Sequence, residues 1–160
     1  MALRTIVTKE DDVLSKMART VERFDKRLHI LLDDMSDTLR DVQGVGLAAP
    51  QVGVLRRVAV VDAGDEGMIE LVNPRIIHAE GEQEGPEGCL SVPGVYGIVK
   101  RPMKVAVRAQ DRHGKTFEKT GEALLARAFC HEIDHLDGKL FTALASRFLD
   151  PEADQAEWDS

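Results

Sequence analysis

The chain has 160 residues, of which 43% are hydrophobic and 31% are charged. This length fits one domain with a single core, and the composition is that of an ordinary globular protein. The net charge of -7 argues against nucleic acids and anionic membrane surfaces as partners. No stretch resembles a secretory signal or a membrane-spanning helix, so a cytoplasmic location is expected. Residues 1–160 are therefore interpreted as a single domain.

Two helices are predicted in the first third of the chain. Residues 10–20 favour a short helix, and a stronger helix extends from Asp25 to Val42. Asp25 suits the N-cap of the longer helix, and Gly44 is a plausible stop. In this helix, apolar residues recur at spacings of three and four, which predicts one buried stripe. The stripe consists of Leu28, Leu31, Leu32, Met35, Leu39 and Val42.

The rest of the chain predicts strands followed by one more helix. Segments rich in β-branched residues predict strands at 57–62, 70–77, 104–111 and 116–120. Residues 85–97 contain several Gly and Pro and predict a loop. Residues 123–136 predict a helix that ends at Gly138. Residues 150–160 form an acidic tail that we expect to be loosely ordered. Clustered strands with helices at both ends predict an α+β domain.

The last predicted helix carries an H-E-x-x-H pattern from His131 to His135. Residues four apart lie on one helix face, so both imidazoles can reach one ion, with Glu132 beside its open position. The competing interpretation is a helix with two surface histidines next to acids. Asp134 is either a solvated charge or a group that orients a ligand histidine.

A catalytic metal site of this kind needs a third protein ligand. Cys89 is the best candidate, because it lies in the predicted Gly- and Pro-rich loop, although free cysteines are more often small buried hydrophobes. Cys130 is interpreted as a core residue, and a disulfide between the two is not expected. His29, His78 and His113 are candidates by composition only.

The segment from Gly44 to Gly53 is dense in small residues. Gly44, Gly46 and Ala49 match the dinucleotide pattern G-x-G-x-x-A, but a helix precedes them where that pattern needs a strand. The small residues instead suggest close approach of the backbone to a ligand. Gln51 could donate a hydrogen bond to an oxyanion, although these residues alone favour a tight turn with an exposed glutamine.

Three blocks together indicate a family. Residues 44–51 (GVGLAAPQ), 87–91 (EGCLS) and 131–135 (HEIDH) resemble the three signature motifs of peptide deformylases. These enzymes remove the N-formyl group from the initiator methionine of new bacterial proteins. The likeness extends from about residue 13 to residue 141, and the three blocks at these separations are highly specific. It implies a fold of mixed, mainly antiparallel β-sheets around a central helix that carries H-E-x-x-H.

The resemblance also implies roles for individual residues. The implied metal ligands are Cys89, His131 and His135. Glu132 would be the general acid/base, while Gln51 and the backbone N–H of Leu90 would stabilise the oxyanion. The residues implied to line the peptide groove or the methionine pocket are Val45, Gly46, Glu87, Leu124 and Ala128.

The family further implies one divalent ion, with Fe(II) expected and Zn(II), Ni(II) or Co(II) able to substitute. The expected partners are N-formylmethionyl nascent peptides, with at most a transient contact with the ribosome. Some members carry an arginine that holds the peptide at the position of Tyr96. Some also dock on the ribosome through a basic C-terminal helix, whereas no Lys or Arg follows Arg147 in this sequence.

Two other classes of protein remain as alternative interpretations of the sequence. A zincin-type metallopeptidase would take its third ligand from downstream, where Glu152 and Glu157 are available. A structural zinc module would need a closed site of four ligands, whereas only three good candidates are present.

Overall fold

The computed structural model describes residues 2–64 and 66–149. The helices are α1 (Lys26–Val42), α2 (Leu124–Leu136) and the short 3-10 helices η1 (Asp12–Ser15), η2 (Ala49–Val52) and η3 (Phe141–Ala143). The strands are β1 (Gly46–Ala48), β2 (Val58–Val61), β3 (Ile69–Glu80), β4 (Gln83–Cys89), β5 (Val92–Arg101), β6 (Lys104–Gln110), β7 (Thr116–Glu122) and β8 (Arg147–Phe148).

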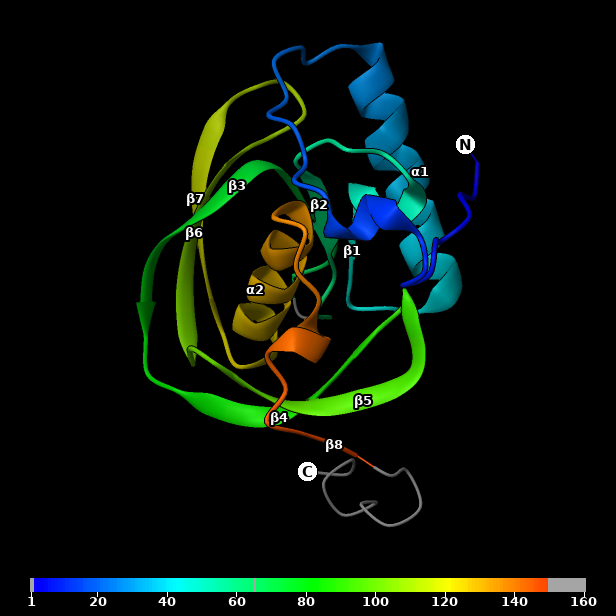
Figure 1. The fold of residues 1–160 in the computed structure, drawn as a ribbon. Helices are drawn as coiled ribbons and strands as arrows, with labels where there is room; N and C mark the ends of the chain where they lie inside the picture. Colours follow the sequence, from blue (N-terminus) through cyan, green and yellow to red (C-terminus); the bar gives the residue numbers. More distant parts are fainter. Residues whose placement is uncertain (1, 65, 150–160) are drawn as a thin grey trace.

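The strands form two sheets. One has the order β1-β2-β3-β6-β7 and the other the order β4-β5-β8, and neighbouring strands in both are antiparallel. Helix α2 lies in the middle of the molecule with strands on several sides, and α1 packs outside β1 and β2 (Figure 1). This arrangement confirms the predicted α+β fold with antiparallel sheets around the helix that carries H-E-x-x-H.

Helix α1 follows the predicted pattern. Asp25 caps its first turn by accepting a hydrogen bond from the N–H of Leu28 at 3.2 Å. The leucines of the stripe are buried against β1 and β2, whereas Val42 is exposed. The helix ends at Val42 as predicted, and the left-handed residue that ends it is Gln43, with φ 54°, not Gly44.

Helix α2 is buried around most of its circumference, because it contacts both sheets. Its apolar residues, together with Cys130, form one core with side chains of β2, β3 and β6. Burial raises the pKa of the Cys130 thiol to about 11, and both cysteines are free. The prediction of Cys130 as a core residue is therefore confirmed. The helix ends at Leu136 with Asp137 as its C-cap, and Gly138 follows with φ 76°.

Two predicted segments differ from the structure. Residues 85–97, predicted as a loop, belong mostly to the paired strands β4 and β5, with a turn at Leu90 and Ser91. That prediction was wrong because β4 contains glycines where side chains of other elements lie close to the backbone. In residues 10–20 only η1 is helical, and it is a single 3-10 turn.

Among the residues that the structure describes, neither α-helix is long and apolar enough to cross a membrane. The predicted acidic tail, residues 150–160, lies outside the described residues, and so do the two downstream carboxylates, Glu152 and Glu157.

Candidate metal centre

The two histidines of the H-E-x-x-H pattern lie one helical turn apart on α2. Their ring centroids are 5.0 Å from each other. Cys89 reaches the same point from the end of β4, where the pairing with β5 shifts register between Gly88 and Cys89. Its Sγ is 3.2 Å from Nε2 of His135, and one ligand atom from each of the three residues lies within 4.8 Å of the others.

The donor set of this cluster fits a divalent metal ion. One sulfur and two imidazole nitrogens are ligands that zinc and iron accept, and three protein ligands leave a further position for water or substrate. Among the described residues no other group of this kind was found. His29 and His113 contact each other instead, and His78 pairs with Glu80.

Glu132 points into the space beside the cluster. It is only 3% exposed, and its Oε1 has no hydrogen-bond partner among the described residues. Burial raises the pKa of Glu132 to about 7, although the neighbouring charge of His131 opposes this shift. A Cβ atom at Gly46 would overlap the Glu132 carboxylate, so β1 can approach α2 this closely only with glycine at that position.

The carboxylate of Glu87 holds the first histidine in place. It accepts hydrogen bonds from Nε and Nη2 of Arg101 at 2.8 and 2.9 Å, from Arg127 at 2.7 Å and from Nδ1 of His131 at 2.8 Å. Burial alone would raise the pKa of Glu87, but the hydrogen bonds from Arg101 and His131 lower it to about 2. Such a bond to Nδ1 fixes the ring orientation and leaves Nε2 for the metal.

The same network includes Asp134, which accepts a hydrogen bond from Arg101 at 2.7 Å. Asp134 is therefore an ion-pair partner of Arg101 and does not bond to a ligand histidine in this structure.

The two ligand histidines have opposite pKa shifts. Burial would lower the pKa of His131, but the charge of Glu132 and the hydrogen bonds of His131 to Cys89 and Glu87 raise it well above 6.5. Burial, with the charges of His131 and Arg101, lowers the pKa of His135 to about 3.

Gln51, in η2, lies on the side of the cluster opposite to Glu87 and Arg127. Its Oε1 accepts the N–H of Ala48 at 3.0 Å, and its Nε2 donates to Oγ of Ser91 at 3.2 Å and to Sγ of Cys89 at 3.6 Å. Its side chain is buried, so the interpretation as a turn with an exposed glutamine was wrong.

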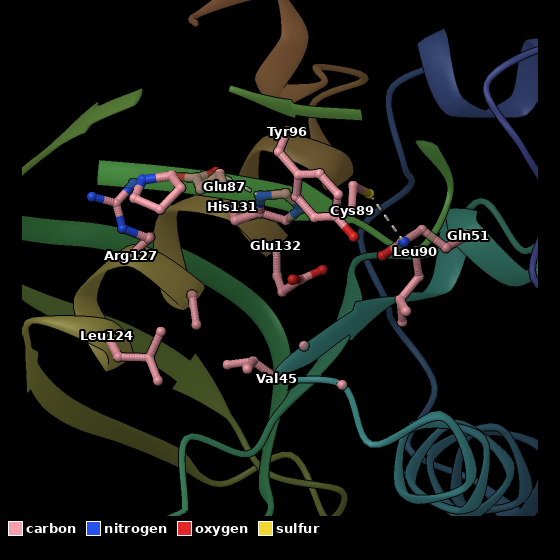
Figure 2. Close-up of a pocket in the computed structure, with 15 residues that line it drawn as sticks. Val45, Gln51, Glu87, Cys89, Leu90, Tyr96, Leu124, Arg127, His131 and Glu132 are labelled. Atoms are coloured by element: carbon pink, nitrogen blue, oxygen red, sulfur yellow. Dashed lines mark hydrogen bonds and ion pairs between the residues drawn. The ribbon is translucent and has the colours of Figure 1, made fainter. Parts of the chain in front are cut away.

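A cavity of about 320 Å³ opens in front of these groups. Figure 2 shows Cys89, Gln51 and Leu90 on one side of it, Leu124 and Arg127 on the other, and Glu132 between them. The predicted residues that line it are Val45, Gly46, Gln51, Glu87, Cys89, Leu90, Leu124, Ala128, His131 and Glu132, whereas the predicted ligand His135 is buried behind them.

Sequence reasoning missed Arg101, Arg127 and Ser91 as parts of this site. Nothing in the sequence near Arg101 marks its hydrogen bonds to Glu87, which lies 14 residues away. Arg127 left a detectable signal, because it is a lone charge between Ala126 and Ala128 on an apolar helix. Tyr96 also lines the cavity, and its ring lies directly against the backbone of Gly88.

Comparisons with known proteins point to one family. Residues 3–149 match the family model for polypeptide deformylase. The chain is 59% identical to a peptide deformylase of Caldicellulosiruptor bescii, over 95% of this chain and 91% of that protein. A crystal structure of a peptide deformylase from Legionella pneumophila has 48% identity and a TM-score of 0.86, covering 98% and 92% of the two chains. One from Thermotoga maritima has 36% identity and a TM-score of 0.87, covering 90% and 98%.

Proposed function

The chain belongs to the polypeptide deformylase family, and from this premise we propose which of its residues carry out the reaction. The enzyme is a metal-dependent hydrolase that removes the N-formyl group from newly made polypeptides and releases formate. Cys89, His131 and His135 hold the divalent ion. This proposal rests chiefly on the contact of 3.2 Å between Cys89 and His135, next to Glu132, whose Oε1 has no hydrogen-bond partner among the described residues.

The ion, when bound, supplies Lewis acidity that acidifies water and polarises the formyl carbonyl. Glu132 takes a proton from water as the water oxygen attacks the formyl carbon. Gln51 Nε2 and the backbone N–H of Leu90 donate hydrogen bonds to the oxyanion that develops. Glu132 then gives its proton to the amine nitrogen, the C–N bond breaks, and formate and a free N-terminus are released. A pKa of about 7 suits a group that both takes and returns a proton near neutral pH.

The cavity supports binding of an apolar side chain next to the reacting centre. Leu124, Ala128 and Val45 supply apolar surface, and we assign the methionine side chain of the substrate to this region. Gly46 and Glu87 line the same cavity. Because both oxygens of Glu87 already accept hydrogen bonds, we assign it chiefly to holding His131 and not to binding the peptide.

The two cysteines allow a matched test of this site. We expect Cys89→Ala to lose most of its metal and its formate release from a formyl-methionyl peptide, because one of three ligands is gone. Cys130→Ala should retain both, since the Cys130 thiol packs in the core and is not one of the three clustered ligands. A thiolate–cobalt charge-transfer band should be present in the cobalt-substituted parent and absent from Cys89→Ala. Stoichiometric metal in Cys89→Ala would contradict the ligand assignment and revive the zincin-type alternative.

We propose Fe(II) as the resident metal, with Zn(II), Ni(II) or Co(II) able to replace it. A thiolate ligand donates more charge than a carboxylate, which suits these softer ions. Protein purified without oxygen should then be more active than protein exposed to air or peroxide, because iron and the Cys89 thiolate oxidise. Full activity with zinc and indifference to peroxide would contradict the assignment of iron.

We also propose that the enzyme works in the cytoplasm, because its nascent substrates are made there and a reducing compartment keeps the Cys89 thiol available. A transient ribosome contact is compatible with this role. Co-sedimentation of the protein with translating ribosomes at low and physiological salt would test it, and the absence of binding at low salt would contradict it.

A further inference from the structure

The side-chain amide of Gln51 is held in one orientation. Its oxygen accepts the N–H of Ala48 at 3.0 Å, so the amide nitrogen must face the opposite way, towards Cys89 and Ser91. Gln51 is 1% exposed, so its protein contacts and not bulk solvent set the orientation of the amide.

The amide nitrogen carries two hydrogens, and the structure provides an acceptor on each side. One acceptor is Oγ of Ser91 at 3.2 Å, and the other is Sγ of Cys89 at 3.6 Å. Ser91 is 0% exposed and lies in the turn between β4 and β5, next to Leu90. Since the bond to Ser91 occupies one hydrogen, the second is directed at the centre where Cys89 meets the two histidines.

We propose that Ser91 is a positioning residue that acts through Gln51. Its hydroxyl holds one amide hydrogen so that the other is aimed at the oxyanion before substrate arrives. This inference rests on the proposed role of Gln51 as an oxyanion donor. The transition state would then meet a donor that needs no reorientation.

The backbone around both residues is fixed from outside the site. The N–H of Val7 donates to the carbonyl of Gln51 at 2.8 Å, and the N–H of Lys9 donates to the carbonyl of Ser91 at 2.9 Å. One N-terminal segment therefore sets the separation of η2 from the β4–β5 turn. For this reason, removal of the Ser91 hydroxyl should leave the backbone in place and release only the amide.

A double-mutant cycle tests the proposal. We expect Ser91→Ala to lower kcat about tenfold with little change in KM, because a donor misplaced by a fraction of an ångström loses much of its effect. In a Gln51→Leu background, the same substitution should change kcat less than about twofold, since the group that it positions is gone. Metal content should be parental in all variants.

A second readout does not depend on activity. The side-chain amide hydrogens of Gln51, assigned by NMR from the signals missing in Gln51→Leu, should exchange faster with solvent in Ser91→Ala. Ser36→Ala is the matched control, because Ser36 is also a buried serine, but it lies on α1 outside the cavity. It should leave kcat and the Gln51 signals unchanged.

Three outcomes would overturn the proposal. A parental kcat in Ser91→Ala means that the hydroxyl positions nothing, and equal losses in both backgrounds mean that Ser91 acts by a general structural effect. A Gln51→Leu variant with parental kcat would instead contradict the proposed oxyanion role of Gln51 itself, and the positioning role would fall with it.

Discussion

Glu132 combines burial, close contact with the backbone of Gly46 and an oxygen that has no hydrogen-bond partner in the described part of the chain. Glu132→Gln keeps the size of the side chain, so it should still fit against Gly46 and leave the metal ligands intact. Proton transfer would fail, and we expect kcat to fall by about a hundred- to ten-thousandfold with metal content retained.

The control for this variant is Glu118→Gln, which changes an exposed carboxylate paired with Arg108 on neighbouring strands. It should be as active as the parent. Deformylation of formyl-methionyl peptide by Glu132→Gln at the parental rate would remove Glu132 from the proposed mechanism.

The side chains that gather at the site were only partly predictable. A pattern of fixed spacing places His131, Glu132 and His135 together, because a helix brings residues four apart onto one face. Cys89 was the best candidate from its Gly- and Pro-rich surroundings, and the resemblance then implied it as the third ligand. Ser91 was missed as a functional residue, since its role depends on a hydrogen bond to Gln51, which lies 40 residues away. No local signal encodes such a contact.

Helix α2 begins from a strained residue. Ala123 has φ 53° and ψ -117°, a conformation that glycine adopts without strain, and Leu124 of the cavity follows directly. Ala123→Gly should therefore stabilise the protein by about 1–2 kcal/mol, with the hydrogen bond from Ala123 N–H to the Met103 carbonyl retained.

Ala126→Gly serves as the opposite control, because Ala126 is buried inside the regular part of α2. We expect it to destabilise by about 1 kcal/mol or more, as glycine does in a helix interior. Urea unfolding of both variants and the parent would measure the difference. A less stable Ala123→Gly would show that the backbone at this position carries no strain.

Strands β4 and β5 show why composition misled the prediction at residues 85–97. Gly88 has the ring of Tyr96 from the facing strand directly over it, and Gly85 lies beside the guanidinium of Arg127. These glycines make room for large side chains of other elements, which is a packing requirement and not a turn signal. By contrast, α1, α2 and the strands β2, β3, β6 and β7 of the larger sheet were predicted from their own side chains, through the apolar spacing of the helices and the β-branched residues of the strands.

Removal of the metal should leave the molecule folded. Glu87 of β4 is bonded to Arg101 of β5 and to Arg127 and His131 of α2, so these elements are joined without any ion. We expect chelation to abolish formate release while the far-UV circular dichroism stays unchanged. Re-addition of the metal should restore activity and raise Tm with ion concentration, because the ion binds only the native state. Loss of secondary structure on chelation would contradict this expectation.

The N-terminal segment makes the site depend on the order in which the chain is synthesised. Val7 and Lys9 bond to Gln51 and Ser91, and the N–H of Ala18 bonds to the carbonyl of Leu136 at 2.8 Å. Leu136 leaves the ribosome about 118 residues after Ala18, which takes roughly 6–24 s at about 5–20 residues per second. A copy still under synthesis therefore has no complete site. Deformylation at any moment is therefore carried out by copies of the enzyme that were completed earlier. The enzyme acts on chains that are still being synthesised, but it is inactive while its own chain is being synthesised.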